Sequence, residues 1–334
     1  MVTMVDVADR AGVSLGTVSR YLNGYNLREY NQKKVKEAIR ELDFNPNIMG
    51  KALRQKQSLT LGVLLYDWTD IFGMSITKAF GEVVEQSHYS LIMCHAEGDL
   101  KRRRQKIQFL RDRCVDGLVV FPILWEGCED LLQKFLDERI PVVMMDGWFE
   151  GLTTDRVSVE NASASLRAVE MLIHANHKKI AVINGSRTET VAQERLSGYR
   201  EALRLYRIPV REDLVTYGNY NCAEAYQITK ELLSLPDPPT ALFVANYYMT
   251  LGAIMALNEM NVRIPDDLSL IGFDHFELSD VIKPPLTVIE QPVEEMGQAA
   301  AALILRRIHG DYQNFPQERR INTRMLIRDS VRVL

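Results

Sequence analysis

The chain has little of what marks disulfide-rich, metal-binding or membrane-spanning proteins. Its four cysteines lie far apart and form no Cys-X-X-Cys pair, which argues against a disulfide framework and a zinc site: Cys94, Cys114, Cys128 and Cys222. No apolar run reaches the roughly 18 residues that a membrane-spanning helix needs. The N-terminus lacks the basic and then apolar pattern of a secretory signal. We therefore expect a cytoplasmic protein with reduced thiols, without a metal and without a membrane partner.

Sequence signatures of enzymes are also missing. The chain contains no Gly-X-Ser-X-Gly, His-Glu-X-X-His, P-loop or Gly-X-Gly-X-X-Gly pattern, so no motif places a nucleophile, a metal or a phosphate. His174, His177 and His275 are more simply solvated or core side chains. We expect no catalytic residue, no cofactor and no enzymatic activity.

What is present is a helix-turn-helix pattern over residues 3–24. Thr3 can cap a first helix, with Asp6 in the capping-box position. Gly12 permits the sharp turn between the helices. Ser14 can cap a second helix that runs to about Leu22. Two short helices around a glycine also occur in many other helical domains, so this pattern alone indicates DNA binding without proving it.

The second helix of this pattern has one buried and one exposed face. Val18 and Leu22 are four residues apart and face inward. The opposite face then presents Leu15, Gly16, Ser19 and Arg20. A recognition helix presents such a face to the major groove of DNA.

Charge is distributed unevenly along the chain. The net charge is −4, yet residues 1–58 hold ten Lys and Arg against six Asp and Glu, which leaves +4 there and −8 in the remainder. A basic head on an acidic body is expected when only the head contacts phosphates.

The remaining pattern indicates a third helix, a short linker and an α/β core. A helix fits residues 31–42, and Asn45-Pro46 ends it before a short segment at 48–55. Beyond residue 58, apolar runs alternate with amphipathic helices, which predicts doubly wound parallel sheets in two lobes. We expect strands at 61–66, 91–95, 117–121, 142–146, 179–184, 241–246, 268–274 and 323–327, with helices such as 76–86, 162–174, 192–205 and 251–259. Ligands of such folds bind beyond the carboxyl ends of the strands.

These features together resemble the LacI/GalR family of bacterial transcriptional regulators over essentially the whole chain. The resemblance is carried by Asp6-Val7-Ala8, Ala11-Gly12-Val13-Ser14, Thr17-Val18-Ser19-Arg20, Leu22-Asn23, Arg195-Leu196-Ser197-Gly198-Tyr199 and Ile271-Gly272-Phe273-Asp274. It implies an all-α helix-turn-helix head at 1–46, a hinge helix and linker at 47–58, and a core of two periplasmic-binding-protein-like lobes at 59–334. We expect lobe one at about 59–158 and 288–320, and lobe two at about 159–287 and 321–334.

The resemblance implies a homodimer that reads a pseudopalindromic operator. Leu53 of the hinge helix would enter the minor groove, and Arg20 would read guanine. Leu15 would contact a thymine methyl group, and polar side chains would position the phosphates. The full expected DNA-binding set is Thr3, Ser14, Leu15, Gly16, Thr17, Ser19, Arg20, Asn23, Asn47 and Leu53.

The resemblance also implies that a small effector binds between the two lobes. The expected effector-binding residues are Asp70, Phe72, Asp146, Trp148, Arg195, Tyr220, Asn246, Asp274 and Gln291. Arg195 and Asp274 could instead form an ion pair between the lobes, and Phe72 or Tyr220 could simply belong to the core. Gly147, Tyr247 and His275 depart from the family pattern, and we expect a neutral or weakly polar carbohydrate held with few charges.

Other functions remain open on the sequence alone. The same DNA-binding regulator could respond to a non-sugar metabolite or to a protein partner. A transport-type sugar-binding protein would share the two-lobed core, but the basic head and the missing signal sequence argue against it. The sequence identifies neither the operator nor the sign of the effector's action.

Overall fold

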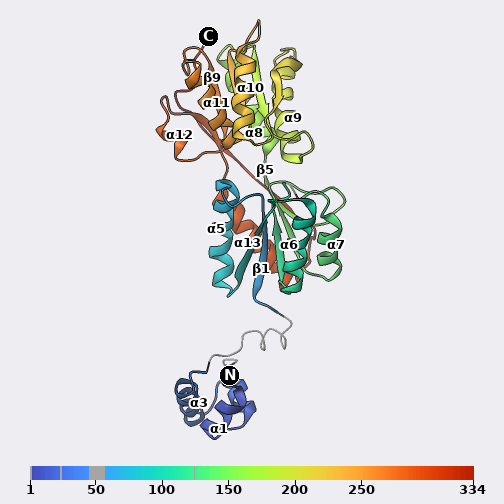
Figure 1. Cartoon of the computed structure of the whole chain (residues 1–334), viewed down its shortest axis with the longest axis vertical. Coiled ribbons are helices and arrows are strands. Elements are labelled where there is room, and N and C mark those ends of the chain that lie inside the picture. The colour runs from blue at the N-terminus through green and yellow to red at the C-terminus, as the bar shows by residue number, and fades with distance from the viewer. Residues whose placement is uncertain (1, 23–24, 45–56, 124) are drawn as a thin grey trace. The chain divides into compact units, whose positions relative to one another are not determined.

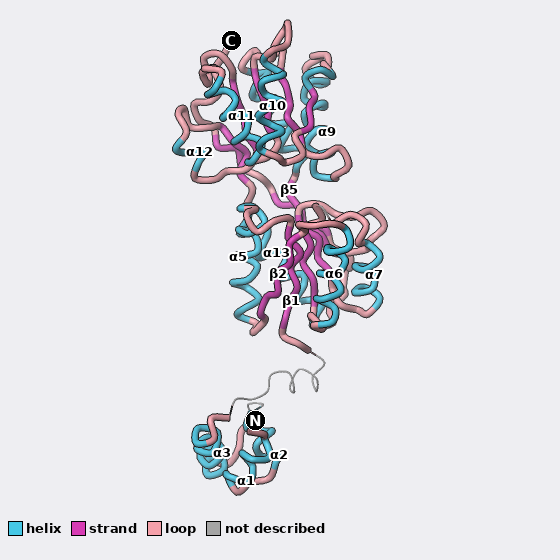
Figure 2. Tube along the Cα trace, viewed as in Figure 1, coloured by secondary structure: helices cyan, strands magenta, loops and turns pink. Residues whose placement is uncertain are grey.

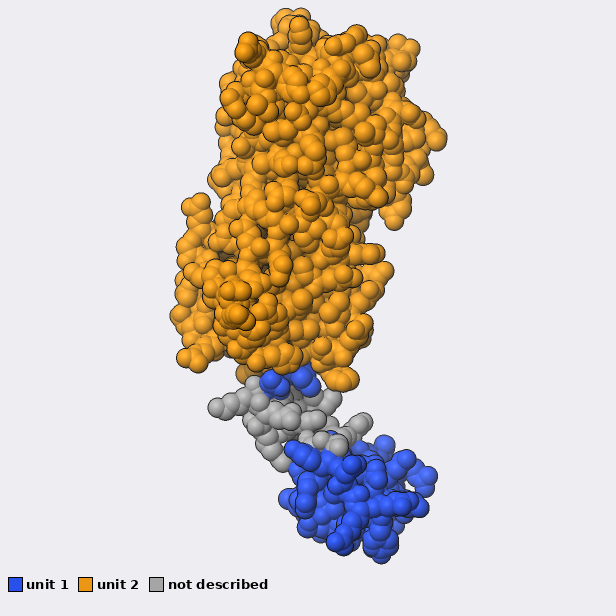
Figure 3. All heavy atoms as spheres, turned by 180° about the vertical axis from the view of Figure 1, so that it is seen from behind, with its two compact units in different colours: residues 1–59 blue, residues 60–334 orange. Residues whose placement is uncertain are grey.

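The computed structural model describes residues 2–22, 25–44, 57–123 and 125–334. The chain divides into two units, residues 1–59 and 60–334, which are coloured separately in Figure 3. The expected DNA contacts Asn23, Asn47 and Leu53, with nearly all of the expected hinge at 47–58, lie outside the described residues.

The first unit contains the predicted helix-turn-helix. Its helices are α1 (Met4–Ala11), α2 (Leu15–Leu22) and α3 (Glu29–Glu41), all labelled in Figure 2; Figure 1 labels α1 and α3. A small core of Val7, Val18 and Val35, none of them exposed, holds the helices together. Gly12 ends α1 in the left-handed conformation with φ of 61°, which an L side chain adopts only with strain.

The second unit contains two sheets. The first consists of β1 (Thr60–Leu65), β2 (Ser90–His95), β3 (Gly117–Val120), β4 (Val142–Met145), β5 (Asp155–Val159) and β11 (Glu318–Ile321). Its order is β11-β5-β4-β3-β1-β2, and its pairings are parallel. The second consists of β6 (Ile180–Asn184), β7 (Val215–Tyr217), β8 (Ala241–Val244), β9 (Ser269–Phe273), β10 (Thr287–Glu290) and β12 (Arg324–Leu326). Its order is β12-β10-β9-β8-β6-β7, with β12 antiparallel to β10.

Helices cover both faces of each sheet, as a doubly wound fold requires. On the first sheet, α5 (Ile71–Gln86) packs with α13 (Val293–Ile308), and α6 (Leu100–Asp112) packs with α7 (Glu129–Asp137). On the second sheet, α8 (Asn161–His174) packs with α9 (Thr190–Leu205), and α10 (Cys222–Leu233) packs with α11 (Tyr247–Glu259). Short helices at Glu212–Leu214 and Leu278–Val281 complete the lobe that contains the second sheet. Figure 2 shows strands and helices arranged in the two lobes.

The predicted strands agree with the structure to within one or two residues, but the list of predicted strands was incomplete. It omitted β5, β7, β10 and β11. These strands are short, and β5 and β11 begin with charged residues, so they lack the apolar runs that indicate a buried parallel strand. The expected return to lobe one near residue 288 falls within β10, which belongs to the second sheet, so the chain returns only after Glu290.

A buried ion pair fixes α13 against the edge of the first sheet. The Arg307 side chain has 0 % exposure and donates two hydrogen bonds, of 2.7 and 3.0 Å, to the Asp155 carboxylate, which is 1 % exposed. Arg307 also donates to the carbonyl of Asp311, and the backbone N–H of Gln317 donates to Asp155. This network joins β5, α13 and the segment that leads into β11.

We predict that Arg307→Met destabilises the protein by about 3–5 kcal/mol, because it leaves the Asp155 charge buried without a partner. Urea unfolding of the full chain measures the change. The neighbouring Arg306 forms a surface pair with Asp311, so Arg306→Met is the matched control and should cost about 1 kcal/mol or less. The double variant Arg307→Met, Asp155→Asn should recover part of the free energy of unfolding that Arg307→Met loses. Equal effects of the two single variants would contradict the prediction.

Candidate functional site

The exposed face of α2 is the candidate DNA-reading surface. Leu15, Gly16 and Arg20 are exposed there, whereas Val18 on the opposite face is fully buried. The Arg20 Nε donates a hydrogen bond of 3.3 Å to the carbonyl of Gly16 on its own helix. Arg20 is therefore held along α2 with its guanidinium on the exposed side, where a base edge could be reached.

The polar residues of this face also shape the helices. The hydroxyl of Ser14 accepts a 3.3 Å hydrogen bond from the backbone N–H of Thr17, and the two hydroxyls are 2.9 Å apart. Thr3 and Asp6 form the predicted capping box, since the backbone N–H of each reaches the side chain of the other. These hydrogen bonds from Thr3 lower the pKa of Asp6. Thr3, Ser14 and Thr17 are thus capping residues first, and contacts to phosphates would be an additional role.

A cavity of about 50 Å³ lies in the second unit and has walls from both lobes. Its lining residues follow the carboxyl ends of strands, as expected for a ligand site in such a fold. The first lobe contributes Tyr66, Asp70, Phe72, Ile123 and Asp146; the second contributes Arg195, Tyr220, Asn246, Tyr248 and Asp274, and Gln291 follows β10. Every expected effector-binding residue except Trp148 lines this cavity.

Trp148 does not line this cavity, so the structure does not bring it together with the other expected effector-binding residues. Trp148 packs against the core of the first lobe and borders a neighbouring cavity with Glu189. Its ring lies beneath the guanidinium of Arg156, at 5.0 Å from the ring centre. The backbone takes the left-handed conformation at Asp146, with φ of 64°, and two residues later the side chain lies outside the cavity.

Arg195 is buried at the cavity wall and is held entirely by the second lobe. Its Nε donates to Asn161 at 2.8 Å, and its Nη1 donates to the carbonyl of Ala245 at 2.6 Å. Its guanidinium lies 3.7 Å from the centre of the Phe273 ring. Among the described residues Arg195 has no ion pair with Asp274, and both residues belong to the second lobe, so the alternative of an ion pair between the lobes was wrong.

Asp274 follows β9 and is held by two hydrogen bonds. The Nε2 of Gln291 donates to one carboxylate oxygen at 2.6 Å, and the backbone N–H of Tyr247 donates to the other at 3.1 Å. Asn246 caps α11 by accepting a hydrogen bond from the N–H of Met249. The polar side chains at the ends of β8, β9 and β10 are therefore fixed before any ligand is present.

Two carboxyl groups of the first lobe have strongly raised pKa values. The pKa of Asp146 is raised to about 6, chiefly by burial; the charge of Arg195 opposes the rise, and the nearby Asp274 adds to it. Burial likewise raises the pKa of Asp70 to about 6, against a hydrogen bond from the N–H of Gly73 that lowers it. Asp146 and Asp274 add to the rise at Asp70. The cavity therefore contains carboxyl groups that take up protons at a higher pH than exposed aspartates do.

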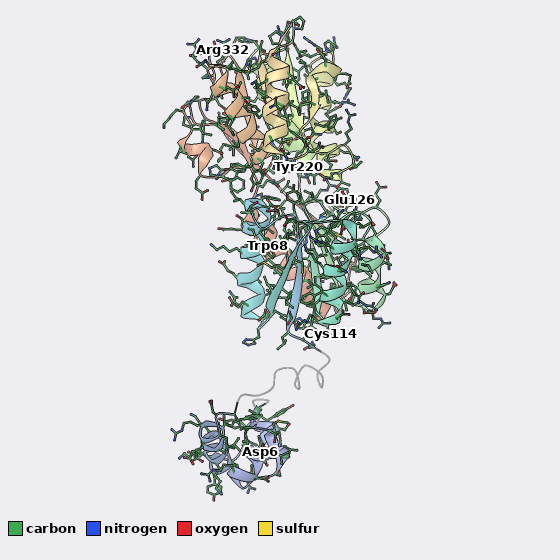
Figure 4. All side chains as sticks on the ribbon, viewed as in Figure 1. Asp6, Trp68, Cys114, Glu126, Tyr220 and Arg332 are labelled. Carbon is green, nitrogen blue, oxygen red and sulfur yellow. The ribbon has the colours of Figure 1, made fainter. Side chains whose placement is uncertain are left out.

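Tyr220 fills the side of the cavity that faces Glu189. Figure 4 labels Tyr220 on the edge of the second lobe that faces the first, and Glu126 on the opposing edge. A Cβ atom on Gly185 would lie 2.2 Å from the Tyr220 ring, so only glycine leaves room for the ring. The pKa of Glu189 is raised to about 7, chiefly by burial; Tyr220 opposes the rise, and Glu126 and Asp146 add to it.

Direct contacts join the two lobes beside the cavity. The hydroxyl of Tyr248, on α11, donates to the carbonyl of Thr69 in the first lobe. Arg320, on β11, pairs with Glu194 on α9 at 2.8 Å. Because the cavity has room for only a few water molecules, a sugar-sized ligand requires Tyr220 to move or the lobes to open.

Several residues of this site were not predicted from the sequence. Tyr66, Ile123 and Tyr248 line the cavity, and Asn161 and Glu189 lie next to it. Tyr66 and Ile123 follow β1 and β3, so the rule that ligands bind beyond strand ends could have identified them. Neither the rule nor the motifs single out Glu189. No group of acidic, histidine or cysteine side chains in the described part of the chain is arranged to hold a metal ion, and none of its helices is long and apolar enough to cross a membrane.

A helix-turn-helix head on a two-lobed core with a polar cavity defines a class of proteins, the ligand-responsive DNA-binding transcriptional regulators. Comparison with known proteins agrees. Residues 3–47 match the model of bacterial regulatory proteins of the lacI family, and residues 169–331 match that of a periplasmic binding protein-like domain. The chain belongs to the LacI family of regulators, is a DNA-binding transcriptional regulator and is not an enzyme.

Relatives and solved structures are similar over nearly the whole chain. The HTH-type transcriptional repressor PurR of Vibrio atlanticus is 33% identical over 92% of this chain and 92% of its own. The PurR repressor of Vibrio parahaemolyticus is 32% identical over all of both chains. The lac repressor dimer bound to operator and the anti-inducer ONPF has a TM-score of 0.86 at 26% identity, covering 99% of each chain. The transcriptional regulator CelR in complex with cellobiose has a TM-score of 0.75 at 27% identity, covering 99% of this chain and 100% of its own.

The raised pKa values predict a dependence of stability on pH. A carboxyl group whose pKa is higher in the folded state takes up a proton on folding, so its stabilising contribution is lost as pH rises through the folded pKa. For Asp70, Asp146 and Glu189 this window runs from about pH 4 to about pH 7. We expect the free energy of unfolding to fall over this window, and to fall less in Asp146→Asn. Urea unfolding at several pH values measures both, and identical pH profiles for the two proteins would contradict the prediction.

Proposed function

We propose that this regulator is a cytoplasmic, homodimeric repressor whose operator affinity is controlled by a small carbohydrate-like effector bound in the core cavity. The observation that carries the proposal is the convergence of polar and aromatic side chains from both lobes on one cavity at the strand ends. Carboxylate, amide and guanidinium groups suit hydroxyl binding, and the Phe72 ring offers an apolar face. Cellobiose and ribose are named in the complexes of two structurally similar regulators.

The proposed mechanism is a shift between two arrangements of the lobes. An effector that contacts Asp70 and Asp146 on one side and Asn246 and Asp274 on the other favours the arrangement in which both sets are within reach. The arrangement of the lobes would then set the affinity of the head for the operator. A coupling free energy of about 1–3 kcal/mol is ordinary for such regulation. The sign of the effect depends on which arrangement binds the operator.

For the head, we predict that Arg20→Ala weakens operator binding by about 10- to 100-fold, because a bidentate arginine–guanine contact is worth about 1–3 kcal/mol. Preference at one base pair of each half-site should relax as well. The operator is first selected from random duplex DNA with the wild-type chain, and affinities are then measured at fixed salt. Arg113→Ala, at an exposed arginine of the core, is the matched control. Unchanged affinity and base preference in Arg20→Ala would show that this residue does not read the operator.

For the cavity, we predict that one sugar stabilises the full chain in thermal unfolding and also changes its operator affinity. A ligand at about 100 times its Kd stabilises by about 2.7 kcal/mol. The panel contains sugars, sugar phosphates and nucleobases. Phe72→Ala should weaken the response, because the apolar face of the ligand loses its contact. Phe109→Ala, at a surface phenylalanine of α6, should leave the response intact. The proposal fails if only nucleobases act, or if the stabilising sugar leaves operator affinity unchanged.

A further inference from the structure

The charges of the core cavity are unbalanced. Asp70, Asp146 and Asp274 line it, and Arg195 is the only cation among its described lining residues. The carboxyl groups are close enough to repel one another, since Asp274 raises the pKa of both Asp70 and Asp146. The described lining of the cavity therefore has an excess of acidic over basic groups.

Arg195 does not correct this imbalance, because its donors are largely committed within its own lobe. It donates to Asn161 and to the carbonyl of Ala245, and its flat face is covered by Phe273. It forms no ion pair within the described chain. Arg195 acts on Asp146 through its charge, which lowers the pKa of that carboxyl group.

The cavity also contains buried acceptors without donors. The Oδ1 of Asp146 and the Oε1 of Gln291 have no hydrogen-bond partner among the described residues. The two residues are 8 % and 6 % exposed, so water outside the protein does not satisfy them. One N–H of the Gln291 amide is used on Asp274, while its oxygen has no donor. An unsatisfied buried polar group is unfavourable, and a ligand that donates hydrogen bonds would remove that cost.

We propose that the effector carries a protonated amine, as an amino sugar does, and that Asp70, Asp146 and Asp274 neutralise it. This inference rests on the proposed function and specifies its ligand. An ammonium group has three donors and no acceptor, and its hydrogen bonds to carboxylates are roughly twice as strong as those between neutral groups. A neutral sugar would satisfy the acceptors but leave the negative charges unpaired. A sugar phosphate or carboxylate would add a further negative charge.

Thermal unfolding of the full chain tests the proposal with matched pairs of ligands. The probes are glucosamine, galactosamine and mannosamine, each compared with glucose, galactose or mannose, together with glucose 6-phosphate. At about pH 7 we expect one amino sugar to bind at least tenfold more tightly than its hydroxyl counterpart, a difference of about 1.4 kcal/mol. Its affinity should fall towards about pH 5, where the carboxyl groups take up protons.

Two variants locate the amine. Asp146→Asn should weaken binding of the amino sugar about tenfold or more, and should weaken binding of the hydroxyl counterpart by less. Asp70→Asn should act in the same direction and keeps the cap of α5, because asparagine is also a good N-cap. Asp266→Asn, at a surface aspartate of the same lobe as Asp274, is the matched control and should change neither affinity. Unfolding midpoints without ligand establish that each variant is folded.

The outcomes separate this inference from the function on which it rests. A hexose that binds as tightly as its amino counterpart and changes operator affinity would overturn the inference and leave the proposed carbohydrate control intact. Amino sugars that fail to stabilise the chain at all would likewise overturn the inference. Binding of glucose 6-phosphate alone would overturn it too, because an anion would then be preferred in an acidic cavity. Only a preference for the amine that is lost in Asp146→Asn or Asp70→Asn supports it.

Discussion

The core depends on one constraint, which is that the chain passes between the two lobes after β5, after β10 and after β11. Three connections at one boundary keep the lobes from separating, while they permit bending or rotation about that boundary. The same boundary is where strands of both sheets end, so polar side chains of both lobes meet there. The buried pair of Arg307 and Asp155 joins the last turn of α13 to the first residue of β5, at the ends of these elements away from that boundary. Any change in lobe arrangement therefore acts on the cavity and on the crossings at once.

The structure of the head is determined differently, because it depends on residues that are close to one another in the sequence. Thr3 with Asp6, Ser14 with Thr17, and the left-handed Gly12 define the helix ends within a few residues of sequence. A core of small apolar side chains then suffices to pack three short helices. Local determinants of this kind leave the exposed face of α2 free to vary with the operator, since none of the caps requires Leu15, Gly16 or Arg20.

This difference between local determinants in the head and long-range contacts in the core explains how much of the structure the sequence could predict. The head and the buried central strands follow from local caps and apolar runs, and they agreed with the structure. Strands β5 and β11 did not, because their charged residues are stabilised by distant partners, such as Arg307 for Asp155, that local patterns do not contain. In the cavity, family motifs identified most lining residues. They missed Tyr248 and Glu189 and misplaced Trp148, because a side chain's direction depends on tertiary packing and on single backbone angles such as φ at Asp146.

The cavity also contains buried polar groups whose missing hydrogen bonds are energetically unfavourable. The buried Arg307 and Asp155 satisfy one another with two hydrogen bonds, whereas Asp146 and Gln291 keep unpaired oxygens in the cavity. Each unpaired group costs about 1–3 kcal/mol, which is the same size as an ordinary allosteric coupling of about 1–3 kcal/mol. A ligand that satisfies these groups in only one arrangement of the lobes gains that free energy only there. The unsatisfied acceptors are therefore sufficient in magnitude to let a small molecule in the core alter the affinity of the head for DNA.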